Sequence, residues 1–335
     1  MSLLALLAAK AAPPVTPAPP VTPAPRDYPT PPSLPQTVDY PIPTTAPYNV
    51  DTFITEMTDP YGHSGSIVHP DVLDFGAKGW RGHRYWMVAT PYYGKAFREE
   101  NPSVWYGDRP TAWTEAGTNP VIPPPENTSR WNSDTDLVHD AATDQLAMVY
   151  RDGSFYQMLT RSSDGATWGA PVRINATPGV AGEVVSPVLH RVGSKWALWG
   201  IQHPTRIMYR WMADTLEGEW SAPVTCTGWN TDIWHFNIVA QGSRLLCLMH
   251  EGWTTGTAYA ATSTDGGVTW VKNPTPILAT KAARRGKWDD GEVYRSAISL
   301  HENGTHMRCW YPAYGTGSDS WRLAYTEIPL TEWPS

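Results

Sequence analysis

From about residue 48 to the C-terminus, apolar residues come in short runs of strand length, separated by turn-forming residues. No long stretch repeats its apolar positions with the period of a helix. One sequence pattern, here called the two-strand phrase, consists of two apolar runs. The first, 67–74, has polar residues near its start, and the second, 85–91, contains Trp and Tyr. The phrase recurs four more times, so the pattern predicts an all-β fold made of five similar units.

Each unit is predicted to hold three strands in the same order. The first strands are expected at 68–73, 134–139, 185–190, 234–239 and 294–299, the second at 84–88, 145–150, 195–199, 244–248 and 306–310, and the third at 102–106, 155–159, 207–211, 257–261 and 321–325. Four units then end in a turn and a tryptophan: Trp113, Trp168, Trp220 and Trp270. A repeat of about 50 residues with several strands per unit predicts a five-bladed β-propeller over residues 48–335. The last unit lacks an outer strand, which residues 48–58 are expected to supply by closing the ring.

Two of the turns resemble the Asp box of sialidase-like propellers, which has the pattern S-x-D-x-G-x-T-W. Residues 263–270 match the pattern, and residues 161–168 hold the same turn one residue shorter, from Ser162 to Trp168. In such a turn the aspartate caps a tight hairpin, a glycine supplies the positive φ, and the tryptophan packs between blades. Asp164 and Asp265 are therefore predicted to be scaffold residues rather than catalytic ones.

Residues 1–47 form a separate region. Residues 2–12 are apolar and rich in helix formers, which predicts a short helix that is too short to span a bilayer. A signal peptide is the alternative, but the run lacks a basic start. Residues 13–47 are rich in proline and repeat Pro-Pro-Val-Thr-Pro-Ala directly, which predicts an extended arm. The region is expected to be an anchor, with a helical plug on a proline tether.

Composition narrows the range of partners. The net charge is −7 and there is no basic run, so nucleic acid is not an expected partner. The 18 tryptophans and 16 tyrosines far outnumber the 5 phenylalanines. Most of these rings are expected to pack between sheets, and a minority to stack on sugars or form an interface. The three cysteines lack metal-ligand spacing, and Cys247 and Cys309 are predicted to be buried thiols.

The first strand of each propeller blade lines the central channel, so polar residues at the strand starts converge from five directions. The polar set is His69, Asp71, Asp134, Asp136, Glu183, Ser186, Asp232, His235 and Arg295, with Trp131, Trp229, Trp234 and Tyr294 nearby. The alternative is that these groups only solvate the channel mouth and cap strand ends. No two histidines have metal-ligand spacing on one element, so no metal or cofactor is expected. A calcium ion in the channel, held by Asp136 or Asp232, is the remaining alternative.

The blade pattern over roughly residues 60–325 resembles glycoside hydrolase family 43. In that family a blade-one Asp is the base, a blade-two Asp orients the other groups, and a blade-three Glu is the acid. The resemblance implies Asp71 as base or nucleophile, Asp134 as orienting group and Glu183 as acid. Only Asp134 stands at a matching position, because His69 and Val185 occupy the other two places. The displaced Asp71 and Glu183 keep the same strand face but move by roughly 7 Å. The remaining channel residues are expected to bind a ligand: His69, Trp131, Asp136, Ser186, Asp232, Trp234, His235, Tyr294 and Arg295.

The strand phrases between His69 and Asp140, together with the proline-rich leader, resemble propellers of bacteriophage tail proteins, including minor tail proteins of phages that infect actinobacteria. The resemblance implies a virion tail-tip protein that is made in the host cytoplasm and works outside the cell. Residues 1–47 would bind other tail proteins, and the propeller, in many copies or as a homo-oligomer, would bind host-envelope carbohydrate. The alternatives are a glycosidase acting on envelope polysaccharide and a purely structural tail component. Glycan binding is favoured because His69 occupies the place of the family's catalytic Asp.

Overall fold

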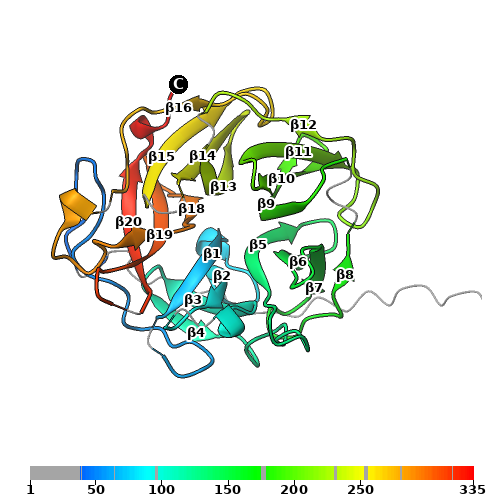
Figure 1. Cartoon of the computed structure of the whole chain (residues 1–335), viewed down its shortest axis with the longest axis horizontal. Coiled ribbons are helices and arrows are strands. Elements are labelled where there is room, and N and C mark those ends of the chain that lie inside the picture. Colours follow the sequence, from blue (N-terminus) through cyan, green and yellow to red (C-terminus); the bar gives the residue numbers. More distant parts are fainter. Residues whose placement is uncertain are drawn as a thin grey trace, which may run out of the picture.

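The computed structural model describes residues 38, 40–63, 65–94, 97–174, 179–229, 232–252, 256–279, 281–318 and 320–335. Within these residues the chain forms five antiparallel sheets that stand like blades around a central axis (Figure 1). The all-β, five-bladed propeller predicted from the repeat is confirmed. The helical elements among the described residues are short 3-10 turns: η1 (Gly76–Lys78), η2 (Phe97–Glu99), η3 (Lys281–Arg284) and η4 (Leu330–Glu332).

The first four blades share one order, in which each strand pairs with the next strand along the chain. Blade one holds β1 (Ile67–Asp74), β2 (Tyr85–Pro91), β3 (Ser103–Arg109) and β4 (Ala112–Glu115); blade two holds β5 (Ser133–Asp140), β6 (Gln145–Arg151), β7 (Gln157–Ser162) and β8 (Val172–Arg173). Blade three holds β9 (Glu183–Val192), β10 (Lys195–His203), β11 (Ile207–Ala213) and β12 (Val224–Thr225); blade four holds β13 (Ile233–Gln241), β14 (Arg244–Glu251), β15 (Thr257–Ser263) and β16 (Val271–Lys272). The first strand of each blade faces the axis (Figure 1). The first three strands of each of these blades lie where the hydrophobic pattern predicts them.

Blade five departs from this order. Its first strand is split into β17 (Glu292–Val293) and β18 (Ala297–Leu300), and both pair with the same edge of β19 (His306–Tyr314). The other edge of β19 pairs with β20 (Arg322–Pro329), the last strand of the chain. The predicted continuous strand at 294–299 is therefore interrupted at its start.

Residues 48–58 lie where the ring closes, as an irregular segment rather than the predicted outer strand. The amide of Ile54 donates to the carbonyl oxygen of Leu323 in β20. Glu56 forms a parallel bridge to Ala112 in β4 of blade one. Ile54 and Met57 are buried between the two blades, in one cluster with Trp105 and Tyr325. The segment thus joins the last blade to the first.

The blades pack on one another through large apolar side chains, as expected for most of the Trp and Tyr residues. The fully buried tryptophans are Trp105, Trp199, Trp211, Trp270 and Trp310. All three cysteines are buried and free. Cys247 and Cys309 are fully buried, which confirms their prediction as buried thiols.

The two Asp-box turns fold as caps, and each one rests on the preceding blade. Asp265 Oδ1 accepts hydrogen bonds from the amides of Val268 and Thr269, at 3.1 and 2.9 Å. Gly267 has a φ of 84°, and a Cβ there would come within 2.4 Å of the Trp199 ring of blade three. Because only glycine fits both the backbone angle and this contact, the turn locks blade four against blade three.

The predicted helix over 2–12 and most of the proline-rich arm lie outside the described residues, as does nearly all of the proposed anchor up to residue 37. Residues 40–47 are described and have no regular structure. Among the helical turns of the described chain, none has the length and apolar character needed to cross a bilayer.

Candidate functional site

Backbone irregularities near the starts of the first strands set the direction of the channel side chains. The ladder of β1 shifts register between Val68 and Asp71, and that of β5 shifts between Ser133 and Asp136. His69 and Asp134 lie inside these shifts with φ values of 52° and 57°, and Ser186 of β9 has a φ of 53°. A bulge re-aims a side chain, and non-glycine residues in this conformation cluster at functional sites. Pro70 has no N–H to donate to the ladder, and it is tolerated because it lies inside the shift in β1.

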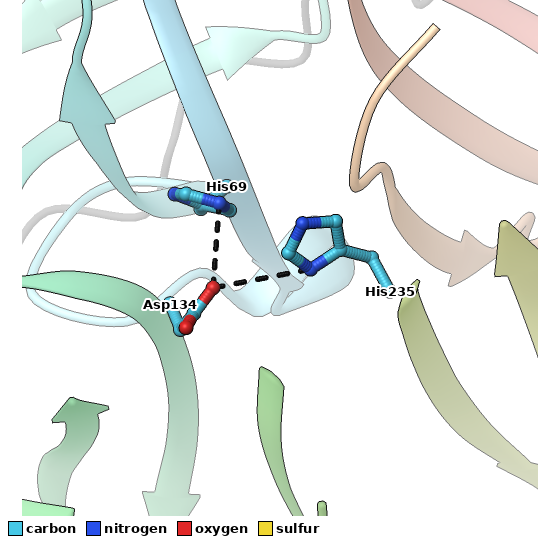
Figure 2. Close-up of side chains that lie close together, drawn as sticks. All are labelled: His69, Asp134 and His235. Carbon is cyan, nitrogen blue, oxygen red and sulfur yellow. Dashed lines mark ion pairs between the residues drawn. The ribbon is translucent and has the colours of Figure 1, made fainter. Parts of the chain in front are cut away.

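His69, Asp134 and His235 come from blades one, two and four and converge on one point (Figure 2). His69 Nε2 lies 3.3 Å and His235 Nδ1 lies 3.9 Å from Asp134 Oδ1. Each residue offers one ligand atom, and these atoms lie within 4.8 Å of one another. All three side chains are buried. Two imidazoles and one carboxylate at this separation can hold a divalent transition-metal ion.

Neighbouring side chains fix the orientation of this cluster. His69 Nδ1 lies 3.1 Å from a carboxylate oxygen of the buried Glu100. Arg151 Nε donates to Asp134 Oδ2 at 3.0 Å, so the other oxygen, Oδ1, faces the histidines. His235 Nδ1 contacts the hydroxyl oxygen of Ser186. A carboxylate behind a histidine ligand fixes its tautomer and raises its basicity, so Glu100 is the partner that a metal-binding His69 needs.

Burial and neighbouring groups shift the pKa values around the cluster. Burial opposes ionisation of Asp134, but the neighbouring His69 imidazole and Arg151 guanidinium hold its pKa well below the ordinary value. Burial lowers the pKa of His235 well below its ordinary value, and the neighbouring His69 adds to the shift. His235 is therefore neutral at pH 7, which is the state in which imidazole binds a metal. Burial raises the pKa of Tyr294, and the nearby Asp134 adds to the shift, so its hydroxyl keeps its proton.

The cluster lies in a cavity of about 570 Å³ at the mouth of the channel. Its lining is rich in aromatic rings and carboxylates: Tyr92, Phe97, Glu100, Trp131, Asp134, Phe155, Glu183, Trp234, Glu292, Tyr294, Tyr314 and Trp321, with Val68, His69, Ser133, Arg151, Val185, His203 and His235. A concave site with a few converging polar groups among aromatic walls fits a small polar ligand such as a sugar.

The predicted catalytic trio is divided between two cavities. Asp134 and Glu183 line the cavity at the channel mouth, and Arg151 pairs with both, with Nη1 at 2.6 Å from Glu183 Oε1. Asp71 lines a smaller cavity of about 250 Å³ farther along the first strands. Asp71 accepts hydrogen bonds there from the Leu137 amide and the Asn237 side chain. The structure therefore does not bring Asp71 to the other two carboxylates.

The predicted ligand-binding residues are divided in the same way. Those that line the cavity at the mouth are His69, Trp131, Trp234, His235 and Tyr294. Ser186 lies behind this lining, with its hydroxyl group in contact with His235. Asp136 and Arg295 pair with each other, and Asp136 lines the smaller cavity. Asp232 is exposed and outside both linings. A calcium ion at Asp136 or Asp232 stays a prediction, although Arg295 and the Leu189 amide already occupy the oxygens of Asp136.

Several cavity residues escaped the sequence analysis, and strand pairing explains where they come from. The end of each second strand lies beside the start of the first strand: Arg151 pairs with Ser133, His203 with Glu183, and Tyr314 with Glu292. The repeat alignment contains this signal, since these residues occupy equivalent places in their blades. Phe97 and Glu100 come from a turn outside the repeated pattern, and Phe155, predicted to start a third strand, lies in the loop before β7. The histidine cluster was missed because its residues come from three blades, whereas metal-ligand spacing in a sequence is recognised only between residues of one element.

Comparison with known proteins points to carbohydrate chemistry. No family model matches the chain. A curated relative is the A type blood N-acetyl-alpha-D-galactosamine deacetylase of Flavonifractor plautii. The match between the two is 26% identical over 329 residues, and it covers 79% of this chain. The match takes in 42% of the relative, so this chain spans less than half of its length.

Solved structures share the propeller. An N-acetylgalactosamine deacetylase from F. plautii, in complex with blood group B trisaccharide, superposes with a TM-score of 0.68 at 22% identity. The match covers 84% of this chain and 95% of that one. A thermostable family-43 glycoside hydrolase superposes with a TM-score of 0.54 at 12% identity, over 78% of this chain and 89% of that one. The expected structural likeness to family 43 is thus confirmed at the level of the fold.

These comparisons overturn the predicted function. The curated relative is an enzyme that modifies a carbohydrate, and it is neither a virion protein nor a component of a phage tail. The resemblance to tail proteins rested on strand sequences between His69 and Asp140 and on a proline-rich leader, most of which lies outside the described residues. The substitution of His69 for the family's catalytic Asp, which had favoured loss of activity, instead supplies a histidine to the cluster of Figure 2.

Proposed function

We propose that this chain is a carbohydrate-modifying enzyme, a metal-dependent deacetylase that removes the acetyl group from an N-acetylated sugar. The observation that carries the proposal is the buried cluster of His69, Asp134 and His235 in the cavity at the channel mouth. The deacetylase of F. plautii supports the reaction class and an N-acetylhexosamine as the sugar.

The donor set fits a first-row divalent ion. Two histidines and one carboxylate leave coordination positions open, as in catalytic rather than structural metal sites. Glu100 provides the carboxylate behind His69 that such ligands require. Within the described part of the chain, Nε2 of His69, the nitrogen that faces Asp134, is buried without a hydrogen-bond partner. A divalent ion held here would act as a Lewis acid on the acetamide and would make water nucleophilic at neutral pH.

Deacetylation adds water across the amide bond and releases acetate and an amine. Tyr294 is placed to donate a hydrogen bond to the amide oxygen as negative charge develops on it, because Trp234 Nε1 donates to the Tyr294 oxygen and leaves the hydroxyl proton free. A proton must also pass from water to the departing nitrogen. A carboxyl group can carry this proton, and both Glu183, the predicted acid, and Glu292 line the cavity.

Metal removal tests the proposal directly. The protein is dialysed against a chelator and assayed for acetate release from an oligosaccharide that ends in N-acetylgalactosamine. Activity should disappear and return on adding Mn²⁺ or Zn²⁺. His69→Ala and His235→Ala should abolish both activity and bound metal, measured by mass spectrometry, and Glu100→Gln should weaken metal binding by about 10- to 100-fold.

His139→Gln is the matched control, because His139 lies on the same strand as Asp134 but pairs with Asp144 away from the cluster. This variant should keep full activity and metal content. Circular dichroism establishes that each variant is folded. Full activity in the metal-free protein, or in a folded His69→Ala variant without metal, would refute the proposed chemistry.

A further inference from the structure

Three aromatic rings stand together in the lining of the cavity, at the junction of blades one and two. We call them the aromatic rim: Phe97, Trp131 and Phe155. They come from three separate segments, the turn η2, the loop before β5 and the loop between β6 and β7. The rings of Phe97 and Trp131 are 5.1 Å apart between centroids. The fold thus gathers aromatic side chains here that are distant in sequence.

Two members of the rim are unusually exposed for their residue type. Phe97 is 41% and Phe155 is 46% exposed, although phenylalanine is rare in this chain and has no polar group to offer water. Phe155 also has a φ of 67°, which is unusual for a bulky side chain. Backbone strain that holds an apolar ring at the edge of a polar cavity indicates a function for that ring, and stability alone does not account for it.

The rim lies one side chain away from the metal cluster. The guanidinium carbon of Arg151 lies 5.9 Å from the Trp131 ring and 5.5 Å from the Phe155 ring. The same guanidinium group donates to Asp134. A sugar whose acetamide reaches the cluster would therefore project its neighbouring unit toward the rim. Sugar rings present apolar C–H faces, which aromatic side chains can cover while the hydroxyl groups stay hydrated.

We propose that the aromatic rim is a subsite for the sugar unit next to the N-acetylated one, so that the substrate is an oligosaccharide rather than a free N-acetyl sugar. The inference rests on the proposed deacetylase function and adds the length of the substrate to it. Phe97, Trp131 and Phe155 then determine specificity, whereas the residues around Asp134 carry the chemistry.

Kinetics on two substrates test the subsite: free N-acetylgalactosamine and an A-type trisaccharide that ends in the same sugar. Wild-type protein should prefer the trisaccharide. Trp131→Ala and Phe155→Asn should lower kcat/KM for the trisaccharide by about tenfold, chiefly through KM, and leave the monosaccharide unchanged. Asparagine is chosen at position 155 because it tolerates the left-handed backbone.

Tyr156→Ala is the matched control, since Tyr156 is an exposed neighbour that stacks on Arg173 outside the cavity lining. This variant should leave kcat/KM unchanged for both substrates. An equal loss on both substrates in the rim variants, or no loss on either, overturns the subsite. If wild-type protein hydrolyses neither substrate, the deacetylase proposal fails, and trisaccharide binding is then followed by saturation-transfer NMR. Binding that is lost in Trp131→Ala supports the rim, and binding that is absent or unchanged overturns it.

Discussion

His69 illustrates how one backbone position separates two side chains that neighbour each other in sequence. His69 and Asp71 are two residues apart, and in a regular strand they would face the same side. The register shift and the positive φ at His69 interrupt the regular strand there, and His69 lines the cavity at the mouth, whereas Asp71, farther along the strand, lines the smaller one. Asp134 and Asp136 of blade two divide in the same way. A bulge therefore assigns alternate polar residues to two separate environments.

Tyr294 gives a prediction at the scale of one atom. Its oxygen accepts a hydrogen bond from Trp234 Nε1 at 3.2 Å, and an indole N–H can only donate. The hydroxyl group donates to none of the described residues, so its proton is available to the substrate. Tyr294→Phe should lower kcat by about 100-fold, the usual effect of losing one oxyanion donor. KM and bound metal should stay the same, because the ring remains in place. A parallel loss of metal would contradict this role.

The elements of the fold were predictable because their signals are local. Strand periodicity and turn residues lie within each blade, so strands such as β6 and β14 appear nearly where the hydrophobic pattern puts them. The split between β17 and β18 was not predicted, because the repeat alignment set Tyr294-Arg295-Ser296 against the first-strand starts of the other blades, which also carry aromatic and polar residues. The site was predictable only as the set of strand starts. Glu100 and Arg151 join it through the turn after β2 and the end of β6, and the cluster of His69, Asp134 and His235 depends on the arrangement of three blades.

The Asp-box turn of blade four gives a prediction at the scale of an element. Burial works against the charge of Asp265, but hydrogen bonds from the Thr269 amide and from Ser263 lower its pKa to about 2. In the unfolded chain the value is about 3.9. A depressed pKa contributes stability above the unfolded value, and this is lost as pH falls through the folded value. Asp265→Ala should lower the free energy of unfolding by about 1 kcal/mol at pH 6.

A second variant, Asp265→Asn, removes only the charge. Its loss in free energy of unfolding should be largest above pH 4 and should shrink toward pH 2, where the wild-type carboxylate also becomes neutral. Thermal unfolding at several pH values measures the difference. Asp214→Asn is the control, because this aspartate is strongly exposed and its ion pair with Lys195 is a surface contact. A difference between wild type and Asp265→Asn that does not change between pH 6 and pH 2 would contradict the charge-dependent cap.

At the scale of the whole molecule, a set of side chains around the channel joins the blades to one another. Equivalent positions on three first strands accept amide protons from the neighbouring blade. The pairs are Asp71 with Leu137, Asp136 with Leu189, and Asn237 with Ile298. The side-chain amide of Asn237 also donates across the channel to Asp71, which joins blade four to blade one. These polar groups hold the propeller closed at its axis, and the apolar surfaces of the blades are packed outside them.

Asp71 is the residue at which the glycosidase resemblance and the structure differ most. Both its oxygens accept hydrogen bonds, from the Leu137 amide and the Asn237 side chain, in a buried setting. An asparagine has only one acceptor oxygen, so Asp71→Asn should leave one donor unpaired and cost about 1–3 kcal/mol in urea unfolding. The proposed deacetylase activity per folded molecule should not change, because Asp71 does not line the cavity that holds His69, Asp134 and His235. Asp232→Asn, at an exposed aspartate before β13, should change neither quantity. A loss of activity with unchanged stability in Asp71→Asn would instead assign Asp71 to the chemistry.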